Sequence, residues 1–272
     1  MWNKVVKKEV TLFYRGFDMF EICIDDVKKW KQSIDAIMNL VKEGGFEIDE
    51  HGIRLRAMDP SQIAMIIFTM KKDSFSKFDV KEKTKMGVNI ETLSKFLSRV
   101  SAKEKMTMKQ DGGMLSIVLE GTKTKRSFKL PLIDVASGPA KELKIDYTAK
   151  IKIRGGAFKE TMKDAALVSP HVLLVADDNK FKIEATGEGG EVIDEYSKGE
   201  DLLEADIKRT TSAVFSQEYL DDIVTGCDDD GEINISLGAP TAEDPRPKPL
   251  CVEYKIGNAD LVFYLAPRIE TE

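Results

Sequence analysis

Apolar residues recur at helical spacing over residues 27–41 and again over residues 93–100, with polar residues between them. Both patterns predict amphipathic helices, because residues three and four apart share one side of an α-helix. Residues 46–57 instead alternate apolar and polar side chains around a turn at residues 50–52, which predicts a β-hairpin. The resulting order of strand, helix, antiparallel strands, helix and more strands predicts an α+β arrangement with helices on one face of a sheet.

The second half of the chain repeats this pattern. A shift of 128 positions places Phe158 at the position of Trp30 in the first helix, and a shift of 127 places Leu220 at the position of Leu93 in the second. Such self-similarity indicates an internal duplication. The sequence therefore predicts two similar domains, residues 19–134 and 147–272, joined by a connector at residues 135–146 and preceded by an N-terminal extension at residues 1–18.

Composition agrees with two globular domains and excludes some classes of protein. The chain has 272 residues, of which 42% are hydrophobic, enough for a sizeable core. Its apolar stretches are far shorter than the roughly 20 residues of a membrane helix, so we expect no membrane association. Cys23, Cys227 and Cys251 are odd in number and form no CxxC pair, which argues against disulfides and a zinc site.

Charge is distributed unevenly between the two halves. Residues 1–134 carry 25 Lys+Arg against 19 Asp+Glu, a net +6, and residues 135–272 carry 16 against 28, a net −12, which together give the total of −6. A polyanion would therefore be attracted to only part of the molecule.

The sequence offers no catalytic constellation. His51 falls in a hairpin turn and His171 follows a proline, and neither has a nucleophile motif nearby. The glycine-rich segment at residues 187–190 lacks the lysine of a phosphate loop. The acidic segment at residues 228–231 lacks the later glutamate of an EF-hand and is predicted to be a turn. We therefore expect a protein that is not an enzyme and holds neither a cofactor nor a metal.

Four segments resemble one known family. They are LRAMDPSQI at residues 55–63, MGVN at residues 86–89, and VEYKI with LVFYLAPRIE at residues 252–256 and 261–270. They closely resemble proliferating cell nuclear antigen (PCNA), in particular its archaeal members, and the resemblance covers residues 19–272. It implies the DNA-clamp fold, in which each of two repeated domains packs two helices on antiparallel sheets, and a head-to-tail homotrimeric ring with helices lining the hole.

The function implied by this resemblance is that of a DNA polymerase sliding clamp, a processivity factor in DNA replication and repair. Such a ring encircles double-stranded DNA without sequence specificity and tethers DNA polymerase, the clamp loader, flap endonuclease and DNA ligase. We expect a location with the chromosome, cytoplasmic in an archaeal cell and nuclear in a eukaryotic one.

Basic residues off the apolar stripes of the helices are the candidates for contact with DNA. Lys31 and Lys163 fall where the family carries such residues, and helical geometry adds Lys28, Lys95, Arg99 and Lys159. Flexible cations contact phosphates without reading bases, which suits sliding. The predicted fourth helix departs from this pattern, since its polar residues Gln217, Glu218, Asp221 and Asp222 are neutral or acidic.

The resemblance also implies a pocket beneath the connector. It would receive a partner peptide with a glutamine, an aliphatic residue and two aromatic residues. Its candidate residues are Met58, Ile63, Pro249, Tyr264, Ala266 and Pro267, with Val135, Leu143 and Ile145 from the connector. The connector departs from the commoner family form at Gly138, Pro139 and Lys141, which puts partner preference in doubt.

Two oppositely charged segments align with the intersubunit strands of the family. The basic one contributes Lys123, Lys125, Arg126 and Lys129, and the acidic one Glu188, Glu191, Asp194 and Glu195. Pairing of these strands between subunits is the implied interface. Read from the residues alone, the lysines could equally protect an exposed sheet edge from aggregation.

Other interpretations stay open. The chain could be one subunit of a heterotrimeric or specialised clamp, or a DNA-binding scaffold that works as a monomer. A nuclease that uses the acidic clusters is a more distant alternative.

Overall fold

A computed structural model describes residues 19–101, 103–136, 138, 143–242 and 245–269. The predicted N-terminal extension and residues 137 and 139–142 of the predicted connector lie outside the described residues. Among the described residues, no helix is long and apolar enough to cross a membrane.

The two halves have the same order of elements, as the periodicity predicts. The first half consists of β1 (Phe20–Ile24), α2 (Val27–Leu40), β2 (Glu43–Asp49), β3 (Gly52–Met58), β4 (Ala64–Lys71), η1 (Lys72–Ser74), β5 (Lys77–Val80), β6 (Thr84–Asn89), α3 (Ile90–Leu97), β7 (Lys105–Asp111), β8 (Met114–Glu120) and β9 (Lys125–Pro131). The second consists of β10 (Ala149–Arg154), α4 (Gly155–Ala166), β11 (His171–Asp177), β12 (Lys180–Gly187), β13 (Gly190–Ser197), β14 (Leu202–Ile207), β15 (Thr211–Ser216), α5 (Gln217–Val224), β16 (Glu232–Leu237), β17 (Leu250–Ile256) and β18 (Ala259–Leu265).

Polar side chains fix the starts of three helices. Asp26 accepts from the Lys29 amide at α2, Asn89 from the Thr92 amide at α3, and Ser216 from the Tyr219 amide at α5. Short polar side chains at this position satisfy amides that have no partner within the first turn of a helix.

A nine-stranded antiparallel sheet runs through both halves, in the order β14-β10-β16-β17-β18-β4-β3-β2-β6. The halves join where β18 pairs with β4 over seven residues, from Ala259 opposite Met70 to Leu265 opposite Ala64. Each half also has a smaller sheet. The five-stranded one ends at β9 and the four-stranded one ends at β13, so both of these strands lie at sheet edges.

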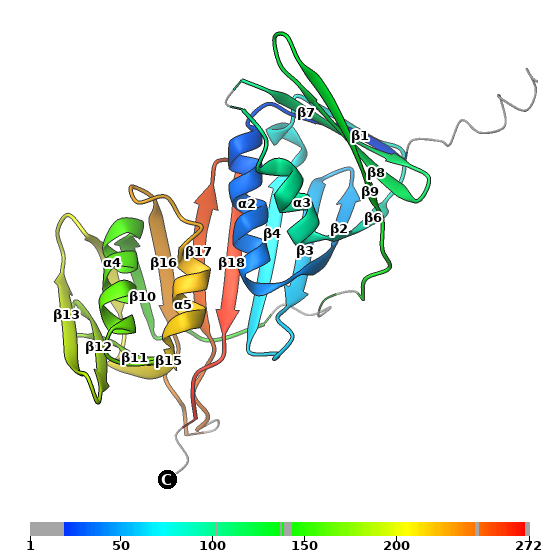
Figure 1. Ribbon diagram of the computed structural model, residues 1–272. Coiled ribbons are helices and arrows are strands. Elements are labelled where there is room, and N and C mark those ends of the chain that lie inside the picture. Colours follow the sequence, from blue (N-terminus) through cyan, green and yellow to red (C-terminus); the bar gives the residue numbers. More distant parts are fainter. Residues whose placement is uncertain (1–18, 102, 137, 139–142, 243–244, 270–272) are drawn as a thin grey trace, which may run out of the picture.

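Helices α2 to α5 cover one face of the large sheet (Figure 1). They contact one another in the order α4, α5, α2, α3, so the row crosses the boundary between the halves. Their apolar stripes are buried, and Trp30 of α2 packs against Phe46 and Phe68 with ring centroids 6.3 and 5.8 Å apart. Phe158 of α4 stacks on Phe181 at the matching place in the second half. The opposite faces of the helices form a polar wall.

Candidate DNA-facing wall, partner pocket and subunit edges

Two of the six cations predicted to face DNA are free on this wall. Lys28 on α2 and Arg99 just after α3 have exposed side chains, and neither side chain has an ion pair with the described residues. They are the wall positions most available to a phosphate.

The other four predicted cations have carboxylate partners within the chain. Lys31 is paired with Asp35, Lys95 with Glu91 at 2.7 Å, Lys163 with Glu160 at 2.6 Å, and Lys159 with Asp229 at 2.8 Å. The side chain of Lys159 is only 16% exposed, because its ammonium group also donates to the Cys227 carbonyl. The structure thus directs Lys159 toward an internal loop and leaves the wall less positive than a count of lysines suggests.

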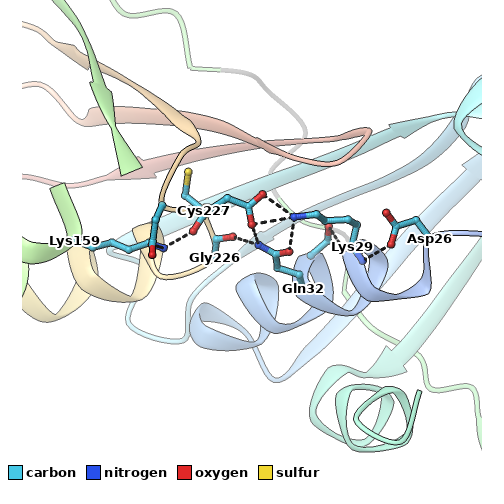
Figure 2. Close-up of polar contacts among 9 residues, drawn as sticks. Asp26, Lys29, Gln32, Lys159, Gly226 and Cys227 are labelled. Carbon is cyan, nitrogen blue, oxygen red and sulfur yellow. Dashed lines mark hydrogen bonds and ion pairs between the residues drawn. The ribbon is translucent and has the colours of Figure 1, made fainter. Parts of the chain in front are cut away.

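That loop follows α5 and joins the two halves of the wall (Figure 2). From the first half, Lys29 donates to both oxygens of Asp228 at 2.9 and 2.6 Å, and Gln32 donates to Asp228 and to the Gly226 carbonyl. The ammonium of Lys29 and the amide of Gln32 hold the pKa of Asp228 below its usual value. The acidic segment predicted to be a turn is therefore also a polar bridge between halves.

Helix α5 carries three carboxylates, those of Glu218, Asp221 and Asp222. Burial, together with the charges of Glu218 and Asp221, raises the pKa of Asp222. This helix contributes negative rather than positive potential to its part of the wall.

Six of the nine predicted pocket residues meet in one depression of about 200 Å³. Its lining consists of Met58, Gln62, Ile63, Met65, Leu143, Pro249, Tyr264 and Ala266. Met58, Ile63 and Leu143 are between 37 and 44% exposed, which is unusual for large apolar side chains gathered in one place. A patch of this kind fits an apolar partner.

Three predicted pocket residues lie outside this lining: Val135, Ile145 and Pro267. Val135 lies beside Gly87 of β6, where its carbonyl accepts a hydrogen bond from Lys85. The sequence argument missed Met65, whose place follows from its pairing opposite Tyr264 across β4 and β18. That register joins the two halves and was not expected from the sequence.

The connector reaches the pocket by crossing the strands of the first half. Ile133 donates to the Gly87 carbonyl of β6 at 2.9 Å, and Gly138 then lies directly on the β3 backbone. A Cβ atom at residue 138 would overlap the Arg56 carbonyl oxygen. Glycine at this position lets the connector lie against β3 and bring Leu143 to the pocket.

A larger hollow of about 360 Å³ lies at the other end of the β3–β4 hairpin. Seven of its ten lining residues are charged or polar, among them His51, Arg54, Lys71, Lys72 and Asp73. The smaller depression is the better candidate for an apolar peptide because of its apolar lining.

The predicted interface residues lie at the two free sheet edges. Lys125, Arg126 and Lys129 are on β9 with Lys123 in the bend before it, and Glu191, Asp194 and Glu195 are on β13 with Glu188 in the turn before it. Several have partners within the chain. Lys129 is paired with Asp111 at 2.8 Å and Glu195 with Lys180 at 2.5 Å, while Asp194 accepts from the Thr161 hydroxyl at 2.5 Å.

Apolar side chains accompany the charges at both edges, which the sequence argument missed. Phe128 of β9 stacks on Phe96 of α3 with ring centroids 5.1 Å apart, and both side chains are partly buried against the core. Near β13, Leu167 is 82% exposed and Ile193 is more than half exposed. Each edge therefore combines unpaired backbone groups, charge and apolar surface.

Comparison with known families accounts for nearly all of the described chain. Residues 19–138 match the description "Proliferating cell nuclear antigen, N-terminal domain", and residues 142–269 match the corresponding C-terminal domain. The chain belongs to the PCNA family. This result confirms the predicted family and its DNA-clamp fold.

Several archaeal relatives of the family are similar over almost their whole length. A DNA polymerase sliding clamp of Pyrococcus abyssi is 36% identical over 254 residues, which is 92% of this chain and 99% of the relative. DNA polymerase sliding clamp 1 of Thermococcus kodakarensis is 35% identical over the same shares. These PCNA relatives confirm the predicted class of function, a DNA polymerase sliding clamp.

Solved PCNA structures share the fold. The crystal structure of PCNA from Thermococcus kodakaraensis has a TM-score of 0.85 at 26% identity, covering 92% of this chain and 100% of that one. A second structure, the C-terminal region of FEN-1 bound to A. fulgidus PCNA, has a TM-score of 0.82 at 25% identity, covering 93% and 100%.

Proposed function

We propose that three copies of the chain close into a ring around duplex DNA and that the ring tethers replication and repair proteins through the apolar pocket. The observation that carries the proposal is the pair of open edges, β9 and β13. Pairing of β9 from one subunit with β13 of the next would join a five-stranded and a four-stranded sheet into nine strands. The same number of strands already crosses the boundary between the halves within one chain.

Head-to-tail pairing requires two different, complementary surfaces. The basic β9 edge and the acidic β13 edge meet this requirement, because they differ and carry opposite charges. A head-to-tail contact leaves one edge of each kind unpaired at the two ends of a row of subunits, and these can pair when the row closes into a ring. Three subunits of two similar domains would give a ring with near-sixfold symmetry, in which every boundary is spanned by a nine-stranded sheet. The row of helices would then face the hole.

Duplex DNA in such a hole would be held loosely. Lys28 and Arg99 are free to contact phosphates, whereas DNA must compete with Asp35, Glu91 and Glu160 for the paired lysines. Contacts to phosphate carry no sequence information and permit sliding. Retention would come from topology, so weak contacts suffice.

The pocket supplies the tether. A peptide with an aliphatic and two aromatic residues would place apolar side chains against Met58, Ile63 and Tyr264, with Leu143 covering them. DNA polymerase, the clamp loader, flap endonuclease and DNA ligase are the proposed owners of such peptides. The chain itself performs no chemical step in this function, and the protein would be located with the chromosome, in the cytoplasm of an archaeal cell.

Light scattering and a DNA-retention assay test the proposal together. The purified chain should have a mass three times its own 30.5 kDa. Once loaded, it should stay on nicked circular DNA and leave when a restriction enzyme makes the DNA linear. A single-chain mass at every concentration would favour the monomeric scaffold. A trimer that forms only with a second clamp protein would favour the heterotrimeric ring.

A further inference from the structure

The turn that forms one side of the pocket is built around a single carboxylate. Asp59 is 4% exposed, and its Oδ1 accepts from the amides of Ile63 and Ala64, both at 2.7 Å. Its Oδ2 accepts from the Ser61 amide at 2.9 Å. Ile63 lines the pocket, so the Asp59 carboxylate sets the shape of this side.

A residue of the other half completes this arrangement. The hydroxyl of Tyr219, on helix α5 of the wall, donates to Asp59 Oδ2 at 2.8 Å. Burial raises the pKa of Asp59, but the three amides and this hydroxyl outweigh it and bring the pKa below its usual value. Asp59 is therefore a charged acceptor, and hydrogen bonds to charged groups are the stronger ones.

Tyr219 acts at a distance from the pocket. It lines a separate hollow of about 230 Å³ together with Asp59, Pro60 and Ser61, and it is not part of the pocket lining. The pocket takes Ile63 from the first half of the chain and Ala266 from the second, and these two are joined by a hydrogen bond of 2.9 Å from the Ala266 amide to the Ile63 carbonyl. The bond from Tyr219 to Asp59 is a further link across the same boundary.

We infer that Tyr219 is a positioning residue for the partner pocket, which holds the turn at residues 59–64 in its peptide-binding shape from across the domain boundary. The inference rests on the proposed function of the pocket. Without the hydroxyl, Asp59 Oδ2 loses a donor in a buried place, and the turn gains conformations that a peptide must then exclude. Part of the binding free energy is spent on that ordering.

The test compares Tyr219→Phe with the unaltered protein. We expect Tyr219→Phe to bind a glutamine-aliphatic-aromatic peptide about fivefold more weakly in calorimetry, because one hydrogen bond is removed and only part of it appears in binding. The amides of Ser61, Ile63 and Ala64 should exchange with solvent faster, while the rest of the sheet is unchanged. This exchange measurement needs no peptide and also excludes general unfolding.

Tyr196→Phe is the matched control. Tyr196 is on β13, at the far edge of the second half (Figure 1). Its hydroxyl contacts the Thr161 hydroxyl at 2.5 Å and the Ala157 carbonyl at 3.3 Å. We expect it to leave peptide affinity and the three amides unchanged. Equal affinity of Tyr219→Phe and the unaltered protein, or equal losses in both variants, would overturn the inference. Failure of the unaltered protein to bind the peptide would instead count against the proposed function, and the exchange rates would still decide whether Tyr219 orders the turn.

Discussion

Arg126 donates from Nη2 to both carboxylate oxygens of Glu104, at 2.8 and 2.6 Å. The same group donates to the Arg99 carbonyl, so Arg126 ties the segment after α3 to strand β9. Glu104 is 3% exposed at its side chain. Arg126, which the sequence suggested for the subunit interface, therefore also stabilises the fold of its own subunit. Replacing it with glutamate would disturb both folding and assembly, and a mass measurement could not separate the two effects.

The interface is better tested at Lys125 and Lys129, whose partners within the chain are exposed. Replacing both with glutamate should shift the trimer toward monomer, because the altered edge would repel the carboxylates of β13. Each exposed pair contributes only about 0.2–1 kcal/mol, so the double change and low ionic strength are needed. Light scattering over a range of protein concentrations measures the shift. Lys255→Glu is the control. It reverses a charge on the β17–β18 hairpin, away from β9 and β13, and should leave the mass unchanged.

Glu104 should make stability depend on pH in the acid range. Arg126, followed by the Ser101 amide, lowers the pKa of Glu104 from 4.5 to about 2. A carboxyl with a depressed folded pKa stabilises the fold above its unfolded pKa, and this contribution is lost as the pH falls from about 4.5 toward 2. Its size at neutral pH is on the order of 3 kcal/mol. Urea unfolding of Glu104→Gln and the unaltered protein should differ at pH 7 and converge near pH 2, and a difference independent of pH would contradict the assignment.

The pocket is tested by shortening its exposed apolar side chains. Ile63→Ala combined with Tyr264→Ala should abolish calorimetric binding of a glutamine-aliphatic-aromatic peptide, since most of the apolar contact would be lost. The mass in light scattering should not change, because neither residue is on β9 or β13. Leu167→Ala, an exposed leucine outside the pocket, should retain peptide affinity. Binding by the double variant would refute the location of the pocket.

The path of the connector predicts that a substitution at Gly138, which does not line the pocket, weakens peptide binding. Alanine at Gly138 would overlap the Arg56 carbonyl, so the connector must move away from β3 and carry Leu143 with it. We expect several-fold weaker peptide binding with unchanged trimer mass. Gly113→Ala is the control, since nothing lies within 4 Å of a Cβ atom at that position. Equal peptide affinities of Gly138→Ala and Gly113→Ala would contradict the described path.

The internal pairing of Lys159 predicts that loss of its partner strengthens DNA binding. Asp229→Asn should free the ammonium group of Lys159 for phosphate and make log K fall more steeply with log salt, by up to about 0.9 for each new contact. Asp230→Asn removes the same charge nearby from a side chain with no ion pair among the described residues, and should have a smaller effect. Fluorescence anisotropy with duplex DNA measures both. The same salt dependence of DNA binding in both variants would mean that the ion pair with Asp229 does not keep Lys159 from contacting phosphate.

Much of the fold follows from local pattern. Helical spacing located α2 and α3, alternation located the β2–β3 hairpin, and the 128-residue shift revealed the second half, because burial of one face imposes the same period in both copies. The resemblance to the family also singled out six residues that the structure gathers in one depression.

The ion pairs were not predictable in the same way. Lys29 and Asp228 are 199 residues apart, and nothing in either local pattern shows that α2 and the loop after α5 meet. Helical geometry correctly put Lys159 off the apolar stripe of its helix, but the direction of a long flexible side chain depends on which carboxylate lies within reach. The same limit applies to Arg126, whose position on an edge strand says nothing about the buried glutamate behind it.

Because β4 pairs with β18, the two halves do not depend on the covalent connector to stay together. Seven residue pairs and a shared apolar core already hold them, much as two subunits of a permanent dimer are held. A protease cut within the connector should therefore leave a nicked but intact particle. Substitutions in the connector would therefore leave the joint between the halves intact, and a lineage could alter which proteins bind the pocket without altering the edges proposed to close the ring.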